Sequence, residues 1–255
     1  MRIKIKLFSE KEIILPFSYN YILQSFIYRN LNIVLSNFLH EKGYLYEKRS
    51  FKLFTFSRIS GKFHIEDKNF IFTPPVFLTV SSPKEEILES FAETIVKKSI
   101  FSLSDNTVYV EAVEVQFYPD FSKQEYEIKM LSPVTVYSTL KSKNGKKKTY
   151  YYSPTEKEFN CLIKENLKKK YFLIYQKKAE INNFEIHPID LKTSNLKIIN
   201  YKGTIIKGWM GKFKIKGEEG ILKVAYDCGI GSKNPQGFGC FTLLHIKERM
   251  EEKKE

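Results

Sequence analysis

Cysteine is scarce in this sequence, with three among 255 residues. The three, Cys161, Cys228 and Cys240, lie far apart and show no C-x-x-C spacing. We therefore expect neither a disulfide framework nor a structural zinc site, since both need paired or clustered cysteines. A chain without disulfides suits a reducing compartment, so we expect a cytoplasmic protein.

Long apolar runs are also missing. The chain has no run of about 18 apolar residues, so we expect no membrane-spanning helix. Its first residues, Arg2-Ile3-Lys4-Ile5-Lys6, alternate charged and apolar side chains, which is typical of a half-buried strand and not of a signal peptide. Hydrophobic residues still make up 42% of the chain, enough for a core. The length allows one large domain or two small ones.

Acidic residues are outnumbered by basic ones, 29 against 42, which gives a net charge of +13. A basic excess of this size favours a polyanionic partner, with nucleic acid first and an anionic membrane surface second. A compositional bias is the alternative explanation. Lys, Ile, Asn, Phe and Tyr are all abundant, as in proteins from AT-rich genomes, and composition alone leaves both explanations open.

The first half of the chain alternates predicted strands and helices. Ile3, Ile5 and Leu7 alternate with charged residues as in a strand. Apolar residues between Leu23 and Phe38 recur at helical spacing, and Gly43 is a suitable helix end. Further elements are strands at 51–58 and 69–80 with Gly61 in the turn after the first, a helix that Ser82 caps and Pro83 opens, and a strand around 113–117.

The second half repeats the pattern. We predict strands at 125–140, 195–201, 204–216 and 238–244, and helices from Pro154 to about Tyr171 and over 218–228. Each half therefore follows the order β-α-β-β-α-β. This order predicts an α+β fold of two tandem ferredoxin-like domains, similar to RNA recognition motifs. We place them at residues 1–120 and 121–246, before a charged tail at 247–255.

A glycine-rich segment covers residues 229–239 and reads GIGSKNPQGFG. Four glycines and a proline exclude regular secondary structure there. Backbone N–H groups in such a loop can approach a phosphate closely, and Lys233 adds a positive charge. The spacing fits neither a Walker A motif nor a dinucleotide-binding G-x-G-x-x-G motif. Taken alone, the segment is either a phosphate-binding loop or a long turn.

The pattern G-x-G-x-x-N-x-x-G-F-G, at the end of a tandem ferredoxin-like chain, resembles the hallmark of the repeat-associated RNA-binding (RAMP) superfamily. The chain is similar in particular to the CRISPR guide-processing endoribonucleases of the Cas-six (Cas6) family. Further segments match in order along nearly the whole chain: 38–41 (FLHE), 51–57 (FKLFTFS), 131–134 (LSPV) and 222–228 (LKVAYDC).

The resemblance implies a metal-independent endoribonuclease, without a cofactor, that cuts CRISPR repeat RNA. Its products would carry a 2′,3′-cyclic phosphate (or 3′-phosphate) and a 5′-OH. By motif, the catalytic residues would be His40, Tyr28 and Lys52. The glycine-rich loop would bind RNA through Gly229, Gly231, Ser232, Lys233, Asn234, Gly237 and Gly239.

These residue types suit metal-free RNA cleavage. The 2′-OH of RNA is the nucleophile, so the reaction needs a base, an acid and a cation for the phosphorane charge. One unbroken helix would separate Tyr28 from His40 by about 18 Å and turn them to different faces. We therefore predict that the helix breaks between them, near Asn30-Leu31-Asn32.

Lys146, Lys147 and Lys148 form a basic cluster beside Asn144-Gly145. They are either a solvated hairpin tip or a phosphate-contacting loop. Lys164, Lys168, Lys169 and Lys170 form a second basic stretch, either a solvated helix face, which we favour, or a second phosphate-contacting surface.

Two other functions stay open on the sequence. One is a non-catalytic RNA-binding RAMP subunit of a CRISPR effector complex, and the other is an enzyme that holds a nucleotide in the glycine-rich loop. The resemblance also leaves open whether the protein associates with other CRISPR effector-complex proteins or forms a homodimer.

Overall fold

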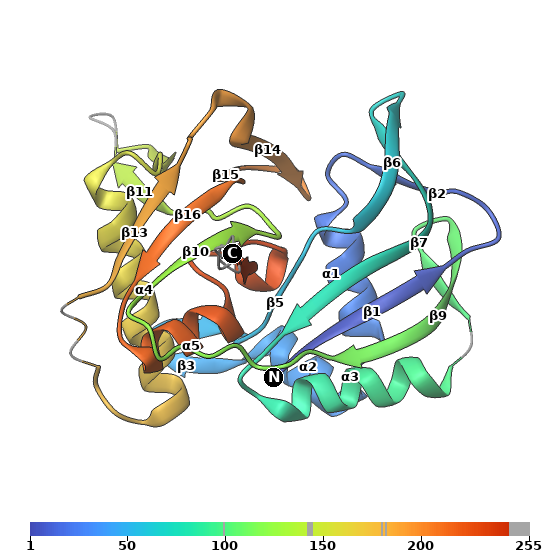
Figure 1. Cartoon of the computed structure of the whole chain (residues 1–255), viewed down its shortest axis with the longest axis horizontal. Helices are drawn as coiled ribbons and strands as arrows, with labels where there is room; N and C mark the ends of the chain where they lie inside the picture. Colours follow the sequence, from blue (N-terminus) through green and yellow to red (C-terminus); the bar gives the residue numbers. More distant parts are fainter. Residues whose placement is uncertain (99, 142–144, 180, 182, 245–255) are drawn as a thin grey trace, which may run out of the picture.

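The computed structural model describes residues 1–98, 100–141, 145–179, 181 and 183–244. The predicted tail at 247–255 lies outside this part of the chain. Within it, no helix is long and apolar enough to cross a membrane. Figure 1 shows two α+β halves side by side, with the N-terminal half on the right.

The N-terminal half is built on a seven-stranded antiparallel sheet. Strand β1 (Arg2–Phe8) lies between β7 (Asn69–Ser81) and β9 (Asn106–Val115). The strands β2 (Ile13–Pro16), β5 (Thr55–Phe56) and β6 (Ser60–Glu66) pair with β7, and β8 (Phe101–Leu103) pairs with β9. Helices α1 (Asn20–Arg29) and α3 (Glu85–Lys97) bury their apolar residues in the same core as Ile3, Ile5 and Leu7 of β1.

The C-terminal half has a four-stranded sheet in the order β13 (Glu185–Ile189), β16 (Lys212–Lys216), β10 (Glu125–Met130) and β17 (Phe241–Leu243). Helices α4 (Lys157–Tyr175) and α5 (Glu219–Cys228) pack with it into a second core. Three hairpins complete the chain: β3 (Tyr44–Tyr46) with β4 (Arg49–Phe51), β11 (Tyr137–Lys141) with β12 (Lys147–Tyr151), and β14 (Leu196–Tyr201) with β15 (Thr204–Trp209).

Both sheets have the ferredoxin-like strand order, in which the first strand lies between the third and the fourth. In the N-terminal half these strands are β1, β7 and β9, and in the C-terminal half they are β10, β16 and β17. The predicted tandem ferredoxin-like fold is confirmed. The first core draws its buried residues from Ile3 to Val108. The second draws them from Phe121 to Phe241, with Leu53 added from the N-terminal half.

Several element boundaries differ from the predictions. Gly61 lies inside strand β6 and not in a turn. All residues of β6 are exposed, but Phe63 and Ile65 alternate with polar residues, a short signal that could have identified the strand. Helix α3 begins at Glu85, and Ser82 does not cap it. The Ser82 hydroxyl instead donates to the carbonyl of Leu53 at 2.8 Å and accepts from the N–H of Lys84 at 3.0 Å.

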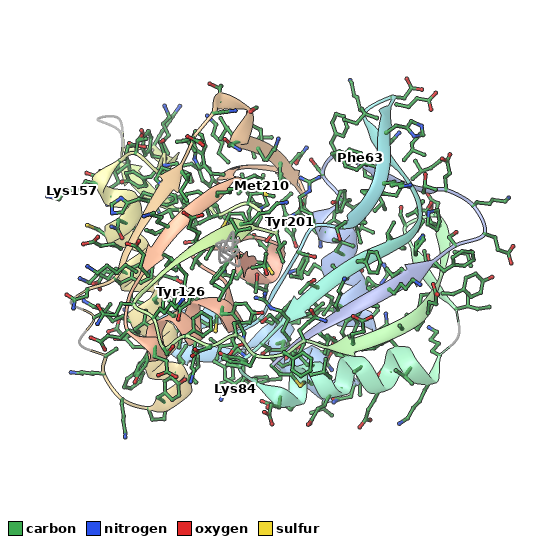
Figure 2. The ribbon with its side chains drawn as sticks, viewed as in Figure 1. Phe63, Lys84, Tyr126, Lys157, Tyr201 and Met210 are labelled. Carbon is green, nitrogen blue, oxygen red and sulfur yellow. The ribbon has the colours of Figure 1, made fainter. Side chains whose placement is uncertain are left out.

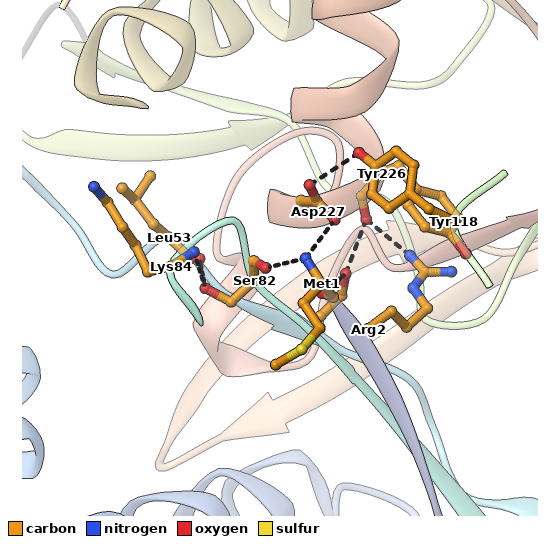
Figure 3. A network of polar contacts seen from close by, with 9 residues as sticks. Met1, Arg2, Leu53, Ser82, Lys84, Tyr118, Tyr226 and Asp227 are labelled. Carbon is orange, nitrogen blue, oxygen red and sulfur yellow. Dashed lines mark hydrogen bonds and ion pairs between the residues drawn. The ribbon is translucent and has the colours of Figure 1, made fainter. Parts of the chain in front are cut away.

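A buried arginine connects the two halves. Arg2 donates from Nη1 to the carbonyl of Phe241 at 2.7 Å and from Nη2 to the carbonyl of Tyr226 at 2.8 Å. Its guanidinium carbon lies 3.4 Å from the centre of the Tyr226 ring, a cation–π contact. Figure 3 shows this contact region, where Asp227 also accepts a hydrogen bond from the Tyr118 hydroxyl at 3.0 Å.

Candidate active site and glycine-rich loop

The helix break predicted from the separation of Tyr28 and His40 is present. Helix α1 ends at Arg29, and α2 (Ile33–Glu41) begins three residues after Asn30. Asn32 caps α2 by accepting from the N–H of Leu35 at 2.8 Å. The Asn30 amide donates to the carbonyl of Phe26 at 2.7 Å, within α1. Asparagine side chains therefore shape a break that no proline or glycine marks.

Tyr28 lies on the last turn of α1 and is half-buried. Its ring packs against Phe54, with centroids 5.8 Å apart. Burial raises the pKa of Tyr28, and the neighbouring phenol of Tyr201 raises it further. The Tyr28 hydroxyl therefore stays protonated at neutral pH, where it can donate or orient a proton but cannot serve as a base.

His40 and Lys52 meet at the C-terminal end of α2. The imidazole of His40 is exposed on the last helical turn. Lys52 approaches from the segment after β4, and its Nζ lies 3.4 Å from the carbonyl oxygen of His40. A cation is favoured at this negative end of a helix. Burial nevertheless lowers the pKa of Lys52.

Gly43 makes this approach possible. It has φ +64° and follows the end of α2, where its N–H donates to the carbonyl of Phe38 at 2.7 Å. A Cβ atom at Gly43 would lie 2.9 Å from Cδ of Lys52. The contact between Lys52 and His40 is made to the main-chain carbonyl of His40, and Tyr28 contacts Phe54, two residues beyond Lys52. Of the three predicted catalytic residues, Lys52 is the one that lines the cleft described next.

A cleft of about 930 Å³ lies between the two halves. Five of its lining residues are basic, namely Arg49, Lys52, Lys169, Lys233 and the buried Lys170, against the single carboxylate of Glu165. The positive field of such a cleft suits a phosphodiester chain. Its lining consists of residues 49–54, 137–139, 162, 165, 166, 169, 170, 228 and 232–236.

The glycines of loop 229–239 serve packing. Gly229, Gly231, Gly237 and Gly239 are buried and all have positive φ. A Cβ at Gly239 would lie 2.0 Å from the carbonyl oxygen of Ile230, and none of the four glycines lines the cleft. Of the loop residues predicted to bind RNA, Ser232, Lys233 and Asn234 do line it. That the glycines contact RNA stays a prediction.

The loop is docked on the N-terminal half. Asn20 of α1 donates to the carbonyls of Gln236 and Gly237, both at 3.0 Å. Gln24, one turn later, donates to the carbonyl of Pro235 at 2.6 Å. Gln24 also accepts a hydrogen bond from the hydroxyl of Tyr201, which lies between the two halves (Figure 2). Helix α1, which carries Tyr28, therefore holds the glycine-rich loop directly.

Asn234 and Lys170 form the interior of the loop. The Asn234 amide donates to the carbonyls of Ile230 and Phe238, both at 3.0 Å, and its Oδ1 accepts from Lys170 at 2.7 Å. Lys170 is 2% exposed, so the interpretation of residues 164–170 as an exposed basic face is wrong at this position. Its spacing from Ile163 and Leu167, both buried, is the signal that places Lys170 on the apolar stripe of α4.

The β11–β12 hairpin carries the basic cluster at one end, whereas Tyr137 at its other end lies beside Lys233 of the loop. Lys147 and Lys148 begin β12, Lys146 precedes it, and all three are exposed. The tip at 142–144 lies outside the described residues. No group of three His, Cys, Asp or Glu side chains is placed to hold a metal ion in the described part of the chain.

Two family profiles match consecutive parts of the chain. The C-terminal domain of CRISPR-associated protein Cas6 matches residues 114–243, and the Cas6 N-terminal domain matches residues 14–114. The chain belongs to the Cas6 family. The resemblance inferred from residues 38–57 and 222–239 is thereby confirmed.

Curated Cas6 proteins match over nearly full length. The chain is 27% identical to CRISPR-associated endoribonuclease Cas6 1 of Methanocaldococcus jannaschii, with 100% of this chain and 96% of that protein covered. It is 29% identical to CRISPR-associated endoribonuclease Cas6 of Pyrococcus furiosus, with 94% and 88% covered. A solved Cas6-related protein from Pyrococcus furiosus has a TM-score of 0.83 at 25% identity, with 97% and 99% covered.

Proposed function

We propose that this Cas6 protein is an endoribonuclease that cuts CRISPR repeat RNA into guide units without a metal ion. The observation that carries the proposal is the meeting of Lys52 with the His40 end of α2 at the wall of a basic cleft. Its relatives are named as endoribonucleases of the Cas6 family. RNA would enter the cleft and place one phosphate beside Lys52.

The chemistry needs only the RNA and these side chains. The 2′-oxygen loses its proton and bonds to the adjacent phosphorus, the bond from phosphorus to the 5′-oxygen breaks, and that oxygen takes up a proton. The products are a 2′,3′-cyclic phosphate, which water can open to a 3′-phosphate, and a 5′-OH end. His40 moves one of the two protons, since imidazole titrates near neutral pH.

Tyr28 and Lys52 have complementary roles in this scheme. The Tyr28 phenol stays protonated, so it acts as a proton donor or orients the phosphate. The Lys52 ammonium stabilises the negative charge that builds up on the phosphorane oxygens. Ser232 and Lys233, from the opposite wall, bind a neighbouring phosphate, and Lys146, Lys147 and Lys148 contact the RNA farther along.

The decisive experiment uses labelled repeat RNA from the CRISPR array of the source organism, in EDTA. We expect one defined cut with 5′-OH ends, slowed about 10² to 10⁴-fold in His40→Ala with RNA binding retained. His187→Ala is the matched control, because His187 is exposed on β13, in the sheet of the other half, and contacts Glu185. An RNA with a 2′-deoxy sugar at the cut site should bind without being cut.

Two other results would contradict the proposal. If the native protein binds repeat RNA and never cuts it, the chain is a non-catalytic RAMP subunit. If cleavage needs a divalent ion and survives in His40→Ala and Lys52→Met, the site is elsewhere. Light scattering with and without RNA tests the homodimer, and co-purification with other CRISPR proteins tests membership of an effector complex; both stay predictions.

A further inference from the structure

Lys170 is a buried ammonium group inside the wall of the cleft. We propose that Lys170 is a positioning residue, which holds the glycine-rich loop in the conformation that presents Ser232 and Lys233 to RNA. The part of this inference that concerns RNA binding rests on the proposed function. It adds to the predicted site a residue from α4, a helix to which the sequence assigned no role in the reaction.

The hydrogen bonds of Lys170 are all made to the loop. Its Nζ donates to the carbonyl of Gly229 at 2.7 Å, to the carbonyl of Gly231 at 3.2 Å and to Oδ1 of Asn234 at 2.7 Å. An ammonium has three N–H donors, so each has an acceptor. The side chain therefore acts as a hub that fixes three residues of one loop at the same point.

The loop is wound around this hub. Asn234 accepts from Lys170 on one side and, through Nδ2, holds the carbonyls of Ile230 and Phe238 on the other. The carbonyl oxygens of Gly229 and Gly231 are gathered toward α4. The Lys170 ammonium offsets the partial negative charges of these two carbonyl oxygens. The oxygens therefore repel a nearby phosphate chain less.

Lys233 depends on this arrangement. It lies between Gly231 and Asn234, with a left-handed φ of +60°. Its Nζ lies 5.0 Å from the centre of the Tyr137 ring, at the cleft wall. A residue in a strained backbone conformation keeps its direction only while its neighbours hold it. Loss of the Lys170 hub should therefore release Lys233 together with its neighbours.

Lys170 also keeps its positive charge inside the wall of the cleft. None of its contacts among the described residues is a carboxylate, and the Cys228 thiol is the titratable group that faces it. Burial lowers the pKa of Lys170 to about 8, so it stays mostly protonated at neutral pH. A methionine would fill the same space without the charge and without the three donors.

The test is a double-mutant cycle of Lys170→Met with Lys233→Met, read by single-turnover cleavage over a range of protein concentrations. We expect Lys170→Met to raise the half-saturating concentration about 10-fold while the maximal rate changes less than about 3-fold. Lys233→Met should cost about 5-fold in the native background and less than about 2-fold beside Lys170→Met, because the two act together. Lys97→Met is the control, since it removes the same charge from an exposed pair with Glu93 on α3, away from the cleft.

Hydrogen exchange of residues 229–239 in the RNA-free protein provides a readout independent of cleavage. We expect exchange at least about 10-fold faster in Lys170→Met and unchanged in Lys97→Met. If Lys170→Met does not fold, Lys170→Gln, which keeps two N–H donors, replaces it with a smaller expected effect. Additive costs in the cycle, or unchanged loop exchange, would overturn the inference. If the native protein neither binds nor cuts repeat RNA, the proposed function is wrong. The hydrogen-exchange measurement then still tests whether Lys170 holds the loop.

Discussion

Replacing Gly43 by alanine should damage stability and cleavage together, because Gly43 lies under Lys52. Its left-handed φ of +64° costs a non-glycine residue about 1 to 2 kcal/mol. The new Cβ would also lie 2.6 Å from the carbonyl oxygen of Phe51, against an ordinary contact of 3.4 Å or more. Relieving this overlap should add about 1 to 2 kcal/mol, as overpacking of a tight site does.

The control variant Gly203→Ala separates the cost of the left-handed backbone from the cost of the steric overlap. Gly203 has φ +82°, but a Cβ there would meet nothing within 4 Å. We expect urea unfolding to show a loss of about 1 to 2 kcal/mol for Gly203→Ala and about 2 to 4 kcal/mol for Gly43→Ala. Cleavage should be normal in the first and at least about 10-fold slower in the second, since Lys52 is displaced from the His40 end of α2. Equal stability losses with normal cleavage in both variants would refute the steric reasoning.

Three further predictions follow from contacts described above. Arg2→Met leaves the carbonyls of Tyr226 and Phe241 without their donor and should cost about 2 to 4 kcal/mol in urea unfolding, whereas Lys6→Met, which breaks the exposed pair with Glu111, should cost less than about 1 kcal/mol. The folded-state pKa of Lys170, about 8, lies below its usual value of 10.5, so the unfolded chain binds more protons between these values and stability should rise with pH there. The free energy of unfolding of the native protein, minus that of Lys170→Met, should increase by about 2 kcal/mol from pH 7 to pH 9.5, and a flat difference would contradict this assignment. Replacing Lys146, Lys147 and Lys148 by glutamine should reduce the slope of log affinity for repeat RNA against log salt by about 2, and an unchanged slope in a filter-binding titration would remove them from the interface.

The sequence predicted the fold well where apolar periodicity follows the core. The order of strands and helices identified two ferredoxin-like halves because β1, β10 and β16 bury alternate residues, and β7 does so from Val76 to Val80. The second strand of the C-terminal sheet, β13, was not predicted, and the predicted strand at 195–201 is β14, which forms a separate hairpin with β15. Strand β6 was not predicted, because its apolar alternation is limited to Phe63 and Ile65 and both side chains stay more than half exposed. The helix break between Arg29 and Ile33 could be predicted only from the requirement that Tyr28 and His40 serve one phosphate.

The candidate site was less accessible to sequence reasoning. A glycine-rich segment suggested backbone contact with phosphate, but in the structure the glycines pack against residues such as Thr55, Thr135 and Phe56 from distant segments. Lys170 was grouped with its basic neighbours, although helical spacing alone could have separated it. That the glycines contact RNA stays a prediction, whereas the assignment of Lys170 to an exposed helix face is wrong. Which side of a loop or helix is buried depends on long-range contacts that local composition does not encode.

The docking of the glycine-rich loop also sets the order in which the protein can become active during synthesis. The proposed catalytic residues lie within the first 52 positions, yet α1 and β5 reach their final contacts only with residues 235–238. A nascent chain on the ribosome therefore carries Tyr28, His40 and Lys52 for most of translation without the opposite wall of the cleft. We expect RNA cleavage to begin only once residues 235–238 have been made and have docked on α1 and β5.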